Sequence, residues 1–249
     1  MTDDWLTSLV STLRHIGLNY DFVLNPGERN AFVRGMLVTL QLCLWTIPGS
    51  LAVGVVLAAM LSSSRRALSR PARVVVEFTR NTPTLVQLYC AFLVLNMLIS
   101  NQLRSAGIEQ NPLTPFIWVV VVVSVHKGVF HAEALRAGIE AVPQSMLEAS
   151  RSLGFSQRQI LTRVQLPLAT RFAMPALVNN LIDLVKMTAV ASAIAVGDVT
   201  YESIMIWSQR DNVLELLLLI LIFFSLLTWL VSRAGRWLEY RWRIPGYGQ

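Results

Sequence analysis

Charged side chains are scarce in this sequence. Of its 249 residues only 14% are charged, whereas 54% are hydrophobic. Ordinary soluble domains carry about 25% charged residues. A water-soluble fold would therefore leave a large amount of apolar surface without cover. The composition indicates an all-α membrane protein that crosses the bilayer several times.

Cysteine is also scarce, and nothing in the sequence resembles a catalytic or metal centre. Cys43 and Cys90 each lie within an apolar run and show neither a disulfide framework nor metal-ligand spacing. The three histidines, His15, His126 and His131, are not grouped as metal ligands, and no nucleophile–base arrangement stands out. The sequence predicts no catalytic residue and no metal site, so we expect that the protein is not an enzyme.

Two further patterns are missing. The first twelve residues contain two aspartates and no basic residue, which is not typical of a secretory signal. No G-x-x-x-x-G-K-[ST] phosphate loop occurs, so the chain is not expected to bind ATP in the Walker manner. We expect no cofactor in this chain.

The long apolar runs predict five membrane-spanning helices. A span needs about 20 mostly apolar residues, and the second helix is expected to begin upstream of its run, near Val74. The predicted spans cover residues 35–64, 81–103, 115–130, 173–196 and 216–232.

The distribution of arginines predicts the orientation of these spans. The segments 62–73, 136–171 and 232–249 contain thirteen arginines, Arg243 among them, whereas the segments on the opposite side contain five. Positive residues favour the cytoplasmic side, so the N-terminus is expected outside and the C-terminus in the cytoplasm. We expect residues 1–34 to form an extracytoplasmic segment and residues 35–249 a single transmembrane domain. The stretch from Trp5 to Ile16 is mildly amphipathic and predicts a short helix that lies on the external surface of the membrane the chain spans.

The segment at residues 137–168 is a long cytoplasmic loop with helical signals. Pro143 suits the first turn of a helix, and Gly154 lies where that helix would stop. Ser156 and Gln159 have the spacing of a capping box for a second helix, which is expected to end before Pro167. A loop of short rigid helices facing the cytoplasm indicates a docking surface.

The same loop resembles a known motif. Glu148-Ala149-Ser150, then Gly154, then Val164-Gln165-Leu166-Pro167 is similar to the EAA loop of ABC importer permeases, with Ser150 and Val164 as conservative departures. Further segments resemble the polar amino acid permeases: Arg80-Asn81-Thr82-Pro83 followed by Leu85-Val86-Gln87-Leu88, and the stretch from Ala132 to Pro143.

The resemblance implies a type I importer permease core in the bacterial inner membrane. It also implies two ATP-binding cassette subunits, a second permease subunit in a homodimer or heterodimer, and an extracytoplasmic solute-binding protein. In such a system the loop would couple the permease to the ATPase. The residues expected to do so are Glu148, Ala149, Ser150, Arg151, Gly154, Leu166 and Pro167.

One departure concerns the cargo. The fourth span of the family commonly reads Leu-Lys-Asp-Thr-Ser-Leu, whereas this chain has Met187 between Lys186 and Thr188. The missing acidic residue argues against transferring a preference for basic amino acids to this chain.

Two lysines are expected in the substrate pathway. Charges deep in a bilayer cost about 2.5–3.5 kcal/mol on insertion scales, which makes them functional candidates. Lys127 lies ~18 Å along the third predicted span, and Lys186 lies ~16 Å along the fourth. Lys186 would pair with Asp183, three residues away. We expect Lys127, Lys186, Thr82 and Thr188 to contribute to the pathway, and the substrate to carry an extra anionic group, as acidic amino acids and opines do.

Two other classes remain open at this point. A secondary transporter or channel would need no ATPase, although the chain shows no internal repeat of the kind such transporters often have. An intramembrane enzyme would need paired carboxylates or a metal motif in the spans. The resemblance favours a permease subunit of an ATP-driven importer for a polar amino acid or a derivative of one.

Overall fold

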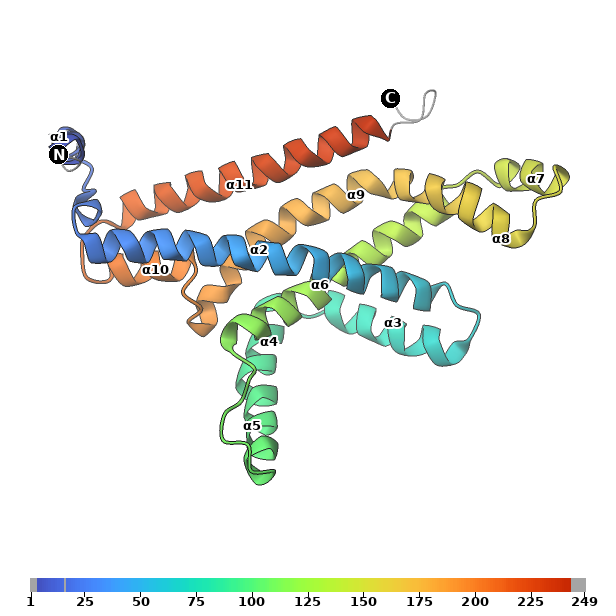
Figure 1. Ribbon diagram of the computed structural model, residues 1–249, viewed down its shortest axis with the longest axis horizontal. Helices are drawn as coiled ribbons and strands as arrows, with labels where there is room; N and C mark the ends of the chain where they lie inside the picture. Colours follow the sequence, from blue (N-terminus) through green and yellow to red (C-terminus); the bar gives the residue numbers. More distant parts are fainter. Residues whose placement is uncertain (1–3, 16, 243–249) are drawn as a thin grey trace. The chain divides into compact units, whose positions relative to one another are not determined.

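The computed structural model describes residues 4–15 and 17–242, and its regular elements are helices (Figure 1). Ile16 and Arg243 lie outside the described residues. The elements are α1 (Asp4–His15), η1 (Asp21–Val23), α2 (Pro26–Leu61), α3 (Arg66–Arg80), α4 (Thr84–Tyr89), η2 (Cys90–Leu95), α5 (Asn96–Ser105), α6 (Pro115–Glu140), α7 (Gln144–Ser152), α8 (Gln157–Ile160), η3 (Leu161–Gln165), α9 (Leu166–Met187), η4 (Thr188–Ile194), α10 (Val199–Trp207) and α11 (Val213–Arg241).

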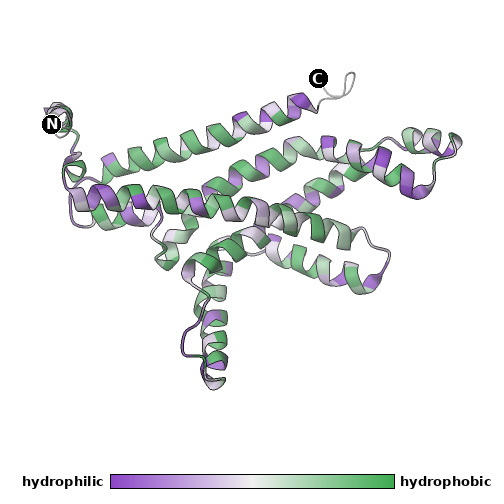
Figure 2. Ribbon diagram, in the orientation of Figure 1, coloured by the Kyte–Doolittle hydropathy of each residue, from purple (hydrophilic) through white to green (hydrophobic). Residues whose placement is uncertain are grey.

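Five helical segments in the described residues are long and apolar enough to cross a membrane. The prediction of an all-α protein with five spans is thus confirmed. Figure 2 shows hydrophobic residues along most of α11 and polar residues toward its C-terminal end. The five segments are Pro26–Leu61, Thr84–Ser105, Pro115–Glu140, Gln157–Ile194 and Val213–Arg241.

The chain forms two compact units, each built from three stretches of the sequence. Unit A comprises Met1–Trp45, Leu88–Val120 and Val185–Thr228. Unit B comprises Thr46–Gln87, Val121–Leu184 and Trp229–Gln249. The long helices α2, α6, α9 and α11 each contribute residues to both units.

Unit A has an aromatic and aliphatic core beside the start of α2. Phe22 and Phe32 meet edge to face with ring centroids 5.7 Å apart, and they pack with Val199, Ile206 and Leu216. Burial and packing of such side chains stabilise the unit. This core joins η1, α2, α10 and α11 within the unit.

The N-terminal helix α1 is present as predicted. It ends in a left-handed turn at Gly17, whose φ is +87°, and the N–H of Leu18 donates to the carbonyl of Leu13 at 3.1 Å. Val10 is buried, whereas Trp5 is 60% exposed. An amphipathic helix with an exposed tryptophan suits a membrane surface, and the position of α1 on the outer leaflet stays a prediction.

Close backbone contact joins α2 to the start of α10. The N–H of Val199 donates to the hydroxyl of Thr39 at 3.1 Å. Asp198 is fully buried and caps α10 by accepting a hydrogen bond from the N–H of Tyr201 at 2.9 Å. Burial raises the pKa of the Asp198 carboxyl to about 6, and hydrogen bonds such as that from Tyr201 oppose the rise.

Replacement of Gly35 by alanine is expected to destabilise unit A. A Cβ at this position would lie 2.9 Å from the carbonyl oxygen of Asp198 and 2.9 Å from Cα of Val199, and backbone atoms cannot rotate away. Overpacking of this kind costs about 1–3 kcal/mol. A lower melting temperature of the detergent-solubilised protein would show it. Gly27→Ala is the matched control in the same helix, because its Cβ would meet only a side-chain oxygen at 3.3 Å. Equal melting temperatures for both variants would contradict the prediction.

Unit B is held together by close approach of α2 and α6. A Cβ on Gly54 would lie 2.6 Å from Cβ of His131, and a Cβ on Gly128 would lie 2.5 Å from a methyl group of Val53. Small residues let helices approach closely in membranes, where association depends on van der Waals packing. The neighbouring core contains Leu57, Ala58, Ala72, Val76, Val129 and Ala132.

The second span does not begin near Val74, as the sequence had predicted. Val74 belongs to α3, which ends at Arg80, and α4 starts only at Thr84. Pro83 explains the break, because proline disfavours helical geometry in the preceding residue and has no N–H to donate. The structure therefore has a separate helix ahead of the second span.

Candidate coupling loop and substrate pathway

The predicted cytoplasmic loop folds as a hairpin of short helices, α7 and α8, within unit B. Pro143 caps α7, which begins at the next residue and runs to Ser152. A proline suits the residues at a helix start because the first N–H groups have no intrahelical partner. The predicted helix is confirmed.

A glycine turn separates the two helices. Gly154 has a φ of +82°. The N–H of Phe155 donates to the carbonyl of Ser150 at 3.1 Å, and the N–H of Gly154 donates to the carbonyl of Arg151 at 2.9 Å. These two bonds form a Schellman motif, which ends a helix with a left-handed residue. The predicted stop at Gly154 is confirmed.

The start of α8 is a capping box, as predicted. The N–H of Gln159 donates to the hydroxyl of Ser156 at 3.4 Å, and the N–H of Ser156 donates to the side chain of Gln159 at 2.8 Å. The expectation that this helix ends before Pro167 is wrong. The chain continues through the π-helical turn η3 into α9, with Pro167 in its first turn. The wider turn precedes a residue that cannot donate the usual hydrogen bond.

The inner face of the hairpin is apolar and fixes its position in unit B. Leu147 of α7 and Ile160 of α8 are buried with Val142 and Ala169. Ser150 is buried as well, and its hydroxyl donates to the carbonyl of Met146 at 2.8 Å. The two helices are thus held by a small core of the chain's own residues.

The outer face of the hairpin is uncovered. Glu148, Ala149 and Arg151 are exposed, and Leu153 at the tip is 76% exposed. An exposed leucine beside two charges on a rigid element can provide both apolar contact and specific ion pairs to another protein. Arg158 adds a further exposed positive charge on α8.

Thr82 belongs to a polar network that the sequence did not reveal. Nε2 of Gln87 donates to the hydroxyl of Thr82 at 2.6 Å and to the carbonyl of Thr79 at 3.0 Å. Oε1 of Gln87 lies 3.1 Å from Nδ1 of His126. An amide oxygen only accepts, so Nδ1 is the donor, and Nε2 of His126 accepts from the hydroxyl of Thr84 at 3.0 Å.

This network fixes the loop before α4 to the middle of α6. The signal that could have found it was the presence of Gln87 and His126, two polar residues within predicted apolar spans.

Lys127 follows this histidine and is buried in α6. The residue is only 6% exposed, and its Nζ lies 5.3 Å from the centroid of the Phe130 ring. This is within the range of a cation–π contact. Because α6 runs unbroken from Pro115 to Glu140, Lys127 lies near its middle.

The other two expected pathway residues, Lys186 and Thr188, lie in unit A. Lys186 is exposed at the end of α9. Thr188 is fully buried at the start of η4, and its hydroxyl donates to the carbonyl of Val185 at 2.8 Å. Here the span changes from α to 3-10 geometry, a change often found at functional sites. The pairing of Lys186 with Asp183 stays a prediction, as does the pathway role of all four residues.

Two ion pairs involve α6. Glu133 accepts from Arg80 at 2.7 Å, and Arg136 pairs with Glu140 at 2.9 Å. The first pair joins α3 to α6 within unit B. The side chains are partly exposed, so each pair contributes little to stability.

Residues 50–244 match the family described as "Binding-protein-dependent transport system inner membrane component". The chain belongs to this family. It is therefore a multi-pass inner-membrane permease, the membrane component of a binding-protein-dependent ABC transporter. Membership implies an ATPase and a binding protein as partners.

Relatives of this permease include amino acid transporters. It is 29% identical over 201 residues to the probable amino-acid ABC transporter permease protein PatM of Vibrio harveyi, covering 81% of this chain and 86% of the relative. It is 33% identical over 192 residues to the glutamate transport system permease protein GluC of Corynebacterium efficiens, covering 76% and 82%.

A solved structure has the same fold as this permease. The crystal structure of an amino acid ABC transporter with histidines matches with a TM-score of 0.74 and 28% identity, over 90% of this permease and 100% of that chain. The likeness therefore extends over most of this permease.

Proposed function

We propose that this permease carries a polar amino acid, or a derivative of one, inward across the bacterial inner membrane. The proteins similar to it along most of their length include a glutamate permease and an amino acid transporter of known structure. The observation that carries the proposal is the rigid α7–α8 hairpin with its uncovered outer face. A chain without a phosphate loop needs a surface that binds an ATPase and follows its movement.

In the proposed assembly, two ATPase subunits bind ATP and magnesium, and two permease subunits form the pathway. The second permease is either another copy of this chain or a related one, and a solute-binding protein delivers the substrate from outside. Seven residues would couple the permease to the ATPase: Glu148, Ala149, Ser150, Arg151 and Gly154 in the hairpin, and Leu166 and Pro167 at the start of α9. Closure of the ATPases on ATP would then move the hairpin as a rigid body and change access to the pathway.

The proposed orientation has residues 1–34 outside and residues 137–168 in the cytoplasm. It is supported by the excess of arginines on the side of the hairpin. Figure 1 shows α7 and α8 at one end of the spans to which they are joined, α6 and α9. This is the position that a cytoplasmic coupling loop requires.

The proposed substrate carries an anionic group beyond the carboxylate common to amino acids. Support comes from Lys127, a buried cation in the middle of a span. Met187 stands where the family commonly has aspartate, so this chain lacks the acidic residue at that position, which could attract a cationic substrate. Acidic amino acids and opine-like conjugates fit both features.

ATP-driven uptake by proteoliposomes tests this function. The permease is reconstituted with the ATPase and the binding protein of its own system, and labelled glutamate, glutamine and arginine are supplied outside. We expect accumulation of a polar amino acid only with ATP inside, and glutamate ahead of arginine. Accumulation that continues without ATP or the ATPase would show instead a secondary transporter. Preference for arginine would contradict the substrate class alone.

A further inference from the structure

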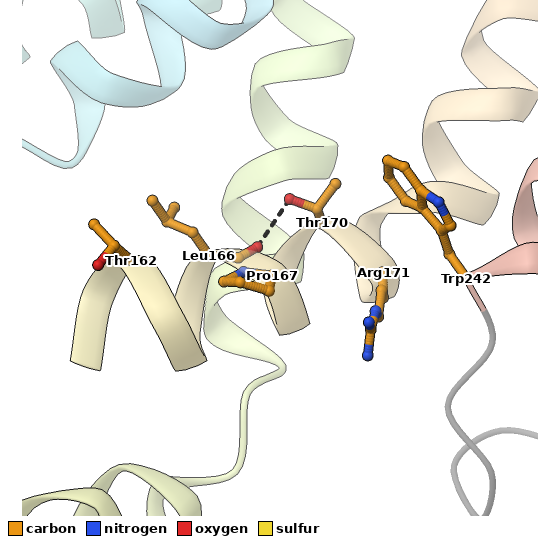
Figure 3. Close-up of a pocket in the computed structure, with 6 residues that line it drawn as sticks. All are labelled: Thr162, Leu166, Pro167, Thr170, Arg171 and Trp242. Carbon is orange, nitrogen blue, oxygen red and sulfur yellow. Dashed lines mark hydrogen bonds between the residues drawn. The ribbon is translucent and has the colours of Figure 1, made fainter. Parts of the chain in front are cut away.

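A cavity of about 380 Å³ lies in unit B beside the start of α9 and the end of α11 (Figure 3). The proposed coupling uses two of its lining residues, Leu166 and Pro167, but assigns nothing to the cavity itself. The residues that line it are Thr162, Leu166, Pro167, Thr170, Arg171 and Trp242.

The cavity lies in a strongly positive part of the chain. Residues 157–171 and 232–242 together contain six arginines and one glutamate. Of the charged residues within 4–15 and 17–242, only Arg171 lines the cavity. Arg171 is exposed, and the described residues offer it no carboxylate within ion-pair distance. Its charge is thus left for a ligand.

The hydrogen-bond donors of the cavity are few and well defined. The hydroxyls of Thr162 and Thr170 already donate to the carbonyls of Arg158 and Leu166, each at 2.8 Å. The guanidinium of Arg171 and the indole N–H of Trp242 are the donors that remain for a ligand. Figure 3 shows the Arg171 side chain and the Trp242 indole extending in opposite directions.

We propose that this cavity binds the headgroup of an anionic phospholipid of the inner leaflet. Arginine binds phosphate through several parallel hydrogen bonds. Tryptophan favours the membrane–water interface, where its ring faces the acyl chains and its N–H faces the headgroups. Leu166 and Pro167 supply an apolar wall. Basic pockets between spans on the cytoplasmic side bind such headgroups.

The choice of leaflet rests on the proposed orientation, but binding itself does not depend on transport or on an ATPase. The position of the cavity also links the bound lipid to coupling. Leu166 and Pro167 lie at the end of the proposed coupling loop, so a bound lipid would pack against the segment that joins the α7–α8 hairpin to the fourth span. Coupling would then respond to the anionic lipid content of the membrane.

Native mass spectrometry of the full-length permease tests the proposal. The protein is released from nanodiscs of phosphatidylglycerol and phosphatidylcholine, and retained lipid is counted. We expect retention of phosphatidylglycerol over phosphatidylcholine, and a loss of about tenfold for Arg171→Gln, which removes a charge-assisted contact. Trp242→Phe, which removes only the N–H, is expected to lose less.

Arg163→Gln is the matched control, because Arg163 lies in the same positive segment but does not line the cavity. Its retention of phosphatidylglycerol is expected to match that of the unaltered protein. An equal loss in both arginine variants would show diffuse attraction to charge and overturn the proposal.

Two further experiments distinguish other occupants. Excess inorganic phosphate should leave the retained phosphatidylglycerol unchanged, and displacement of the lipid would assign the cavity to free phosphate instead. Removal of residues 243–249 should also leave it unchanged. A gain in lipid on truncation would show that the end of the chain itself fills the cavity, and the proposal would fail.

Discussion

Replacement of Gly154 by valine is expected to uncouple the permease from its ATPase and to reduce ATP-driven uptake by about tenfold or more. A Cβ at this position would touch nothing within 4 Å, so the effect does not come from a clash. It comes from φ, which is +82°. A left-handed conformation costs a residue with a Cβ about 1–2 kcal/mol, and a β-branched side chain is the least tolerant. The turn would relax, and α7 would lose its orientation relative to α8.

Gly154→Asn provides the control for this variant. Asparagine adds a side chain of similar size but adopts the left-handed region readily, so coupling should be mostly retained. The measurements are co-purification with the ATPase and uptake by proteoliposomes, each corrected for the amount of permease in the membrane. Full association and uptake in Gly154→Val would refute the role of the turn. An equal loss of association and uptake in Gly154→Asn would show that side-chain volume on the outer face of the hairpin, rather than the turn, causes the effect.

The second large effect is expected at Lys127. Replacement by serine should lower uptake of an acidic amino acid by about 10- to 100-fold, since a hydrogen bond to a charged group contributes about 1.5–3 kcal/mol. Uptake of neutral amino acids should fall less, because they lack the second carboxylate. The measurement is competition between labelled glutamate and glutamine in the same proteoliposomes.

Lys127→Met controls for volume. It keeps the length of the side chain over the Phe130 ring but removes the charge, so it should behave like Lys127→Ser in substrate preference. Lys127→Arg should retain part of the preference for acidic substrates. Unchanged uptake and unchanged preference in Lys127→Ser would exclude a role for this residue in passage of the substrate.

Much of the architecture could be predicted from the sequence because its causes are local. Apolar runs give the five spans, and the turn at Gly154 and the capping box at Ser156 depend on neighbouring residues alone. The start of the second membrane span was predicted wrongly, because the apolar residues around Val74 hid the effect of Pro83. The continuation of the helix through Pro167 was missed because a proline near a helix start is compatible with both outcomes.

Contacts between segments that are distant in the sequence could not be predicted from local patterns. The pairing of Arg80 with Glu133 joins residues 53 positions apart, whereas Arg136, which is closer to Glu133 in the sequence, pairs with Glu140. The bonds of Gln87 to Thr82 and His126 likewise depend on how α4 meets α6. Periodicity shows which residues are apolar but not which helices become neighbours. The cavity at Arg171 and Trp242 also arises from residues far apart in the sequence.

The change of winding in the fourth span has a geometric consequence. A 3-10 helix rises about 2.0 Å per residue and an α-helix 1.5 Å. The seven residues of η4 therefore cover ~14 Å of depth instead of ~10.5 Å. With three residues per turn, Thr188, Ala191 and Ile194 stand in a single file, and all three are buried. The fourth span thus presents a straight, narrow edge of mostly small side chains that begins two residues after Lys186. An α-helix would have spread the same residues around its circumference.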